Sequence, residues 1–173
     1  MSKFVLVTGA SGGIGKGIAK VLGSRGYKVA LVSRTEKELK LVQSSIEEAG
    51  GKACVHVADT TDYESVQRMV DNIVTEHGLP DVLVNNAGVG HQSMFVRSNP
   101  KHWKEMIDCN IIGYLNTMRI MLPEMVARKK GHVINIGSMS SIAGNPGMSV
   151  YGGTKSFWNS TIDALRKEHR INT

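Results

Sequence analysis

The sequence predicts an α/β domain built on a doubly wound parallel sheet, with about five strands and helices on both faces. Three observations lead to this fold class. Short β-branched apolar runs alternate with longer segments of helical periodicity. The apolar runs are nearly continuous, as expected for parallel strands that helices cover on both sides. The length of 173 residues fits one domain of ordinary size.

The elements follow one another in regular order along the chain. Each predicted strand is a short run rich in valine, isoleucine and leucine, and five such runs are present: Lys3–Thr8, Lys28–Ser33, Ala53–Val57, Val82–Asn85 and His132–Gly137. Each predicted helix fills the interval after a strand, and the helical segments are Gly13–Leu22, Glu36–Ala49, 62–77, 101–129 and 149–169. No linker, repeat or low-complexity stretch interrupts them, so we expect residues 1–173 to form one domain.

Composition excludes several classes of protein. The 41% hydrophobic and 21% charged residues are typical of a globular chain and argue against disorder. The net charge of +6 comes from basic residues scattered over predicted helices without interleaved aromatic residues, so we expect no nucleic-acid partner. Cys54 and Cys109 have no metal-ligand spacing and are expected to be reduced thiols. Without a long apolar run, we expect a cytoplasmic protein with no membrane span.

A glycine-rich loop joins the first strand to the first helix. It reads Thr8-Gly9-Ala10-Ser11-Gly12-Gly13-Ile14-Gly15. Glycines there let the backbone turn tightly and approach a pyrophosphate closely, while the helix N-terminus offers free N–H groups to the phosphates. The loop predicts a dinucleotide site that involves Gly9, Ser11, Gly13, Ile14 and Gly15. The alternative is that these glycines only allow a tight strand-to-helix turn and bind no ligand.

The end of the second strand bears on the choice of cofactor. An acidic residue at that point would bind the ribose hydroxyl of NAD, but this chain has Ser33-Arg34-Thr35. A guanidinium can hold a 2′-phosphate through charge-assisted hydrogen bonds, so Ser33 and Arg34 favour NADP over NAD. The alternative is a surface arginine that pairs with Glu36 or Glu38.

Three further motifs accompany the loop. Asn85-Asn86-Ala87-Gly88 follows the fourth strand, Ser138 follows the fifth, and Tyr151-Gly152-Gly153-Thr154-Lys155 begins the last helix. With these motifs the chain resembles the short-chain dehydrogenases/reductases of the classical type, from residue 3 onward. The resemblance implies a Rossmann-like fold and hydride transfer between NADP(H) and a carbonyl or secondary alcohol substrate.

The last motif can be argued from its chemistry. Tyr151 and Lys155 are four residues apart, so they share one face of a helix. A nearby ammonium stabilises a phenolate and lowers the pKa of a tyrosine, which then acts as general acid or base. A surface pair without function is the alternative for these two residues.

Ser138 and Asn110 complete the expected catalytic set. Ser138 lies where ligands bind in open α/β sheets, and its hydroxyl can hold the substrate oxygen. Ser140 and Ser141 compete for this role, and the family spacing selects Ser138. A polar residue such as Asn110 usually faces solvent from a long helix. The resemblance implies instead that its carbonyl holds a water linking Lys155 to bulk solvent.

The remaining cofactor residues follow the third and fourth strands. The resemblance implies that Asp59 contacts adenine and that Asn86, Ala87 and Gly88 line the adenosine ribose side. Capping of the next helix is the rival role for Asp59. We expect Asn85 to be structural and interpret two histidines as non-catalytic: His56 and His91.

The resemblance has consequences at the C-terminal side. Family members continue with two more strands and a segment that covers the substrate, so we expect a domain incomplete at its C-terminal end. The fifth strand is then an exposed edge, and residues 1–173 alone are expected to be poorly stable and essentially inactive. A truncated, inactive nucleotide-binding fragment is the alternative to an active reductase.

The resemblance also implies a homodimer or homotetramer in a full-length form. Subunits would pair through the helices at 101–129 and 149–169. These helices hold an apolar cluster, for which plain core packing is an equal alternative: Ile111, Ile112, Leu115, Met118, Met121 and Leu122.

Overall fold

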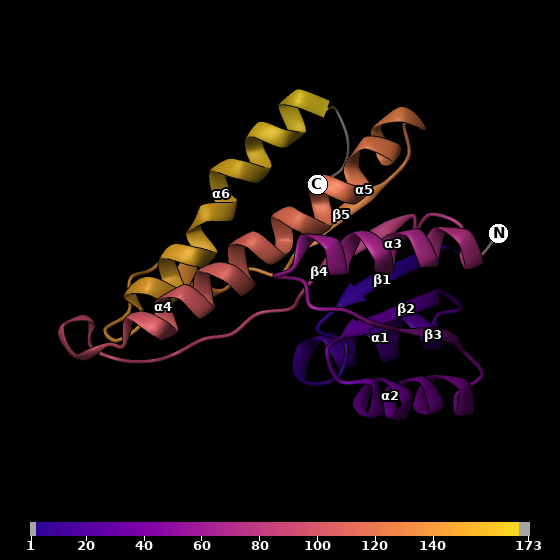
Figure 1. The fold of residues 1–173 in the computed structure, drawn as a ribbon, viewed down its shortest axis with the longest axis horizontal. Coiled ribbons are helices and arrows are strands. Elements are labelled where there is room, and N and C mark those ends of the chain that lie inside the picture. The colour runs from indigo at the N-terminus through magenta and orange to yellow at the C-terminus, as the bar shows by residue number, and fades with distance from the viewer. Residues whose placement is uncertain (1–2, 170–173) are drawn as a thin grey trace.

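A five-stranded parallel sheet forms the centre of the protein, as the computed structural model shows for residues 3–169 (Figure 1). The strands lie in the order β3-β2-β1-β4-β5 and pair in parallel throughout. Their bounds are β1 Phe4–Thr8, β2 Lys28–Ser33, β3 Lys52–Val57, β4 Val82–Asn85 and β5 His132–Asn135. The predicted fold class is confirmed, and all carboxyl ends of the strands meet at one edge of the sheet.

The described part of the chain has six α-helices, and five of them cover the two faces of the sheet. The six helices are α1 Gly13–Ser24, α2 Glu36–Glu48, α3 Tyr63–His77, α4 Pro100–Ile107, α5 Gly113–Ala127 and α6 Ser149–His169. Helices α1 and α2 lie on one side, and α3, α5 and α6 lie on the other (Figure 1). This two-sided covering explains why the strands read as continuous apolar runs.

The central strand β1 shows how the two apolar layers divide. Successive side chains of a strand point to opposite faces. Val5 and Val7 therefore pack in the layer formed with α1 and α2, while Leu6 packs in the layer formed with α3, α5 and α6. All three side chains are buried. Burial on both faces fixes the register of β1 against its neighbours.

The segment expected as one helix over 101–129 is divided in the structure. A π-helical turn, Asp108–Ile112, separates α4 from α5. Such wide turns inside α-helices are frequent at functional sites. Asn110 lies in this turn and is fully buried, whereas a polar residue of a long helix usually faces solvent.

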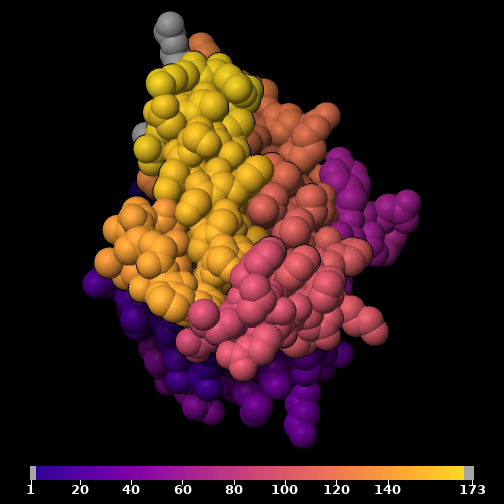
Figure 2. Space-filling view, turned by 90° about the vertical axis from the view of Figure 1, so that its left-hand side faces the viewer, coloured from indigo at the N-terminus to yellow at the C-terminus, as the bar shows by residue number. Residues whose placement is uncertain are grey.

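The outer strand and the last helix form the far side of the described chain. Strand β5 lies at the edge of the sheet, as expected, and Ile134 on it is 41% exposed. Helix α6 lies across the face shown in Figure 2, between the orange segment before it and the pink segment that contains α4. The pale grey atoms in that view are residues that the structure does not describe.

The apolar cluster on these helices belongs largely to the core. Met118, Met121 and Leu122 are buried in the layer beside α3, which agrees with core packing for these three. Ile112, in contrast, keeps 38% of its surface exposed. Among the described residues, we find no helix with the length and apolar character needed to cross a membrane.

Candidate active site

A cleft of about 980 Å³ opens at the carboxyl ends of the strands. Loops after all five strands and the start of α6 contribute to its wall. Most of the predicted site residues line it: Gly9, Ser11, Gly13, Ile14, Ser33, Arg34, Asp59, Asn86, Ala87, Gly88, Ser138, Tyr151 and Lys155. Two predicted residues, Gly15 and Asn110, do not line the cleft and contribute from behind its wall.

The glycine loop is packed tightly on one side and open on the other. Gly9 has a φ of 64°, and a Cβ there would lie 2.8 Å from the Cα of Ala87. A Cβ on Gly15 would collide with the carbonyl oxygen of Gly9. Gly12 and Gly13, in contrast, would place a Cβ in open space. The loop thus needs glycine to pack against its support, and it leaves its other side free for a ligand.

Asn86 is the support on which the loop rests. Its Nδ2 donates to the carbonyl oxygens of Thr8 at 3.0 Å and Gly9 at 3.3 Å. The predicted residue after β4 therefore ties the fourth strand to the first βα loop. Its role in this structure is to shape the loop.

Thr8 is a residue of this support that the sequence analysis missed. Its Oγ1 accepts hydrogen bonds from the backbone N–H groups of Asn86 at 2.9 Å and Ala87 at 3.1 Å. It also donates to the carbonyl of Val84 at 3.4 Å. A threonine at the end of a β-strand is common, so only its position directly before the glycine loop could have singled it out.

Arg34 lies at the rim of the cleft, at the end of β2. Its side chain is exposed and lines the cleft, next to Ser33. Among residues 3–169, none of the ion pairs involves Arg34, and Glu36 pairs instead with Lys40 at 2.7 Å. The pairing of Arg34 with Glu36 that was the alternative interpretation is therefore absent, although Glu38 also lines the cleft.

Asp59 shapes the loop after β3. Its Oδ1 accepts hydrogen bonds from the backbone N–H and the hydroxyl of Thr61, both at 2.9 Å. The N-cap of α3 is Asp62, which accepts from the N–H of Glu64 at 3.0 Å. The rival role of Asp59 as a cap of that helix is therefore wrong, and Asp59 remains in the cleft wall.

Ser138 follows β5 and begins a short 3₁₀ turn, Met139–Ser141. Its hydroxyl oxygen accepts from the N–H of Ser140 at 3.2 Å, which fixes its direction. Ser140 also lines the cleft. Ser141 instead donates to the carbonyl of Ser138 at 2.6 Å, so its hydroxyl is used to hold the turn together.

Tyr151 and Lys155 lie one turn apart on α6, and both line the cleft. Gly90 lies against the Tyr151 ring, where a Cβ would be 3.2 Å from two ring carbons. Lys155 is only 4% exposed, and its Nζ donates to the carbonyl of Ile136 at 2.8 Å. Burial lowers the pKa of Lys155, so its ammonium gives up a proton more readily than that of a surface lysine.

A second tyrosine lies beside this lysine and was missed in the sequence. The hydroxyl of Tyr114, on α5, is 3.4 Å from Nζ of Lys155. The Tyr114 side chain is buried, and burial raises the pKa of its hydroxyl well above the ordinary value. Tyr114 is therefore a neutral neighbour that positions the ammonium. No sequence motif contains it, because the contact joins residues 41 positions apart.

Asn110 connects three parts of the cleft wall from behind. Its side chain accepts from the N–H of Val89 and donates to the carbonyl of Val89, both at 2.9 Å. It also donates to Oγ1 of Thr154 at 3.0 Å. Its backbone carbonyl accepts from the indole N–H of Trp158 at 2.8 Å. The water molecule expected on this carbonyl stays a prediction.

The other polar residues considered lie apart from this set. Asn85 is fully buried. Its side chain accepts a hydrogen bond from the hydroxyl of Thr117 at 2.7 Å and donates one to the side chain of Asn135 at 3.0 Å. These contacts agree with the structural role that we expected for Asn85. The ring of His91 stacks on His102 with centroids 4.0 Å apart. Neither His56 nor His91, the two histidines that we interpreted as non-catalytic, lines the cleft.

These features together define a class of protein. A glycine loop after the first strand opens into a cleft at the carboxyl ends of a doubly wound parallel sheet, which is the arrangement of Rossmann-type dinucleotide-binding domains. The sequence profile described as short chain dehydrogenase matches residues 3–172. The chain belongs to this family.

Curated relatives cover most of this chain. An uncharacterized oxidoreductase of Listeria monocytogenes is 34% identical over 167 residues, which are 96% of this chain and 67% of that protein. The 3-oxoacyl-[acyl-carrier-protein] reductase FabG of Staphylococcus aureus is 36% identical over 156 residues, 90% of this chain and 63% of FabG. The chain therefore spans about two thirds of the length of these relatives.

Solved structures agree with the fold. A metagenomic short-chain oxidoreductase in complex with NADP has a TM-score of 0.89 and 32% identity, over 98% of this chain and 78% of that one. An NAD⁺-bound xylitol dehydrogenase has a TM-score of 0.93 and 28% identity, over 97% and 65%. One relative thus holds NADP and another holds NAD⁺.

Proposed function

We propose that this chain forms the cofactor-binding and catalytic part of an NADP(H)-dependent oxidoreductase that acts on a carbonyl or secondary alcohol. The observation that carries the proposal is a shared cleft. Ser138, Tyr151 and Lys155 open into the same space as the glycine loop. The family match and a reductase among the relatives argue against an inactive nucleotide-binding fragment.

The residues of the loop fit a dinucleotide. Gly12 and Gly13 leave open space where other residues would place a side chain, so a pyrophosphate can approach the backbone there. Ile14 directs an apolar side chain, 66% exposed, toward the same cleft. When bound, the nicotinamide supplies or accepts the hydride.

The protein's own residues handle the proton and the substrate oxygen. Tyr151 donates a proton from its hydroxyl to the substrate oxygen during carbonyl reduction and removes it during alcohol oxidation. Ser138 donates a hydrogen bond to the same oxygen and holds it beside Tyr151. Lys155 stabilises the phenolate of Tyr151, and its lowered pKa suits it to return a proton.

Replacement of Tyr151 by Phe tests the assignment of the proton donor. On the protein expressed from its complete gene, we expect kcat to fall by about 10²–10⁴-fold because a general acid is lost. NADPH oxidation with a panel of aldehydes and ketones measures kcat, and NADPH fluorescence measures cofactor affinity. Tyr63→Phe, at an exposed position on α3, is the matched control. A Tyr151→Phe enzyme with parental turnover contradicts the proposal.

Preference for NADP is proposed from Arg34, which is exposed at the cleft rim without a protein ion pair among residues 3–169. Arg34→Ala should weaken NADPH binding by about ten- to a hundredfold, the value of a charged hydrogen bond, and barely change NADH binding. Arg25→Ala, outside the cleft at the end of α1, is the control. Equal loss for both cofactors would assign Arg34 a structural role instead.

The same proposal extends to partners. We expect a small-molecule substrate. We also expect the complete protein to be a homodimer or homotetramer whose subunits pair through the surfaces of α4–α5 and α6. Exposed apolar side chains on these elements support such a contact: Ile107, Ile112 and Phe157. The relatives are named for oxoacyl and polyol substrates, and we propose no narrower substrate class.

A further inference from the structure

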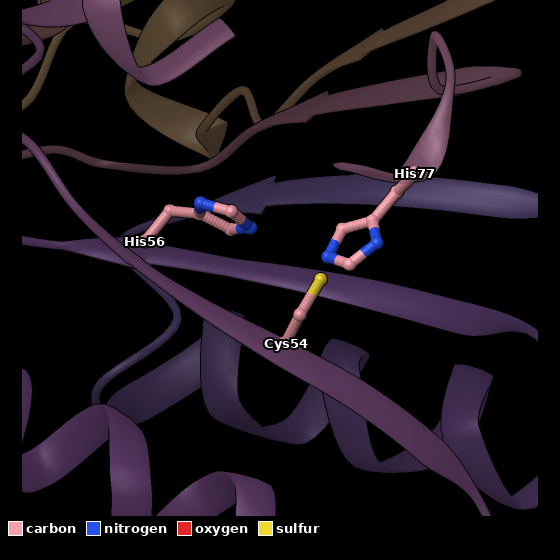
Figure 3. Close-up of side chains that lie close together, drawn as sticks. All are labelled: Cys54, His56 and His77. Carbon is pink, nitrogen blue, oxygen red and sulfur yellow. The ribbon is translucent and has the colours of Figure 1, made fainter. Parts of the chain in front are cut away.

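Cys54, His56 and His77 form a cluster outside the cofactor cleft, which we call the Cys-His-His cluster. Cys54 and His56 are two residues apart on β3 and therefore point to the same face of the sheet. His77 is the last residue of α3. Figure 3 shows the sulfur and one ring nitrogen of each histidine turned toward a common space. One such atom from each residue lies within 4.8 Å of the others.

The polar atoms of this cluster are poorly satisfied by the protein. In residues 3–169, Nε2 of His56 is buried without a hydrogen-bond partner. Sγ of Cys54 has a weak contact, 3.9 Å, with the carbonyl of Val29. A buried polar atom without a partner costs free energy, so such an arrangement calls for an explanation. A bound cation that accepts the lone pair of Nε2 supplies one.

We propose that the Cys-His-His cluster binds one Zn²⁺ ion. A thiolate and two imidazoles are the ligand types that zinc prefers, and three protein ligands leave its fourth position open. Zinc–ligand bonds of about 2.0–2.3 Å require the ligand atoms to be about 3.5 Å apart, so the side chains must draw together by about 1 Å. Rotation of the two imidazole rings can supply this movement.

Glu76 offers negative charge beside the cluster. Its carboxylate is 3.5 Å from Nε2 of His77, and its side chain is 58% exposed. It can complete the zinc site through a water molecule. Lys28 contributes opposing positive charge near Cys54 and His56, and Glu76 counters it at the same two residues.

The protonation of the cluster gives the binding a definite pH dependence. Burial raises the pKa of Cys54 to about 11, so without metal the thiol keeps its proton. Burial lowers the pKa of His56, so this ring is neutral and ready to bind near pH 7. Zinc must displace the Cys54 proton, and binding therefore releases a proton and becomes tighter as pH rises.

A metal at this point would join the edge strand of the sheet to the end of a helix. Strand β3 is the outer strand beside β2, and α3 packs over the same face. None of the three ligands lines the cofactor cleft. The ion would therefore have a structural role, holding α3 against β3, and would take no part in hydride transfer.

Cobalt substitution tests the site independently of enzyme activity. The untagged protein, expressed from its complete gene and stripped with a chelator, is titrated with Co²⁺, and a thiolate-to-cobalt charge-transfer band is expected to saturate at one ion per chain. Zn²⁺ should abolish the band and raise the thermal midpoint of unfolding. Cys54→Ser should remove the band and weaken Zn²⁺ binding by at least about 100-fold, since even outer-shell changes cost 10- to 100-fold.

Matched variants separate the site from general effects on folding. Cys109→Ser, at the other cysteine, should keep the band and the parental affinity. His77→Gln, which keeps a polar side chain at the end of α3, should weaken Zn²⁺ binding while the circular dichroism spectrum stays the same. Absence of saturable Co²⁺ binding overturns the proposal. So does a band that persists in Cys54→Ser or disappears in Cys109→Ser.

Discussion

Replacement of Asn110 by Ala should destabilise the fold markedly. The Asn110 side chain is fully buried and makes two hydrogen bonds to the backbone of Val89 and one to Thr154. Alanine leaves both backbone groups of Val89 unpaired, at about 1–3 kcal/mol each. Because Val89 is half-buried and water can reach it in part, we expect the loss at the lower end, about 2–4 kcal/mol.

Asn116→Ala is the matched control for this prediction. Asn116 is 9% exposed and makes one side-chain hydrogen bond, to the carbonyl of Thr60 at 2.9 Å. This change leaves one carbonyl unpaired instead of two backbone groups, so it should cost about 1–3 kcal/mol, less than Asn110→Ala. Urea unfolding of both variants, followed by circular dichroism, gives the two changes in the free energy of unfolding. If Asn116→Ala costs as much as Asn110→Ala, the bonds of Asn110 do not carry the stability assigned to them.

Two further predictions concern stability alone. Gly15→Ala should lower the free energy of unfolding by more than about 1 kcal/mol because its Cβ would collide with the carbonyl of Gly9, whereas Gly17→Ala, with open space around it, should raise it by about 0.5–1 kcal/mol. Thermal unfolding of the pair checks the opposite signs. In the metal-free protein, burial lowers the pKa of His56. Just below pH 6.5 the unfolded state therefore binds more protons than the folded state. The free energy of unfolding should fall as the pH is lowered through that range. Urea midpoints between about pH 5 and 7 should therefore vary less in His56→Gln, and an unchanged slope would exclude His56 as the cause.

The fold could be predicted because its signals are local. Each strand is a continuous apolar run, and each helix begins after a loop rich in glycine or polar residues. Parallel pairing then follows, because a helix between two strands returns the chain to the same edge of the sheet. The cleft residues were also found, since the carboxyl ends of the strands meet at that edge.

The features that escaped prediction depend on contacts between distant residues. The π turn at Asn110 has no local signature, and its placement is held by Trp158, 48 positions away. The contact of Tyr114 with Lys155 and the approach of His77 to Cys54 are of the same kind. From the sequence, Cys54 was interpreted as a reduced thiol and His56 as a non-catalytic histidine, because His77 lies far from both along the chain.

The placement of Lys155 links the stability of the core to the chemistry proposed for the cleft. Its ammonium is buried between the carbonyl of Ile136 and the hydroxyl of Tyr114. Tyr114 in turn packs against the Trp158 ring, with centroids 5.3 Å apart, and Trp158 holds the carbonyl of Asn110. A change at Tyr114 or Trp158 therefore alters both packing and the position of the lysine charge. For this reason the effects of such variants on turnover have to be compared with their effects on unfolding before either residue is assigned to the proton path.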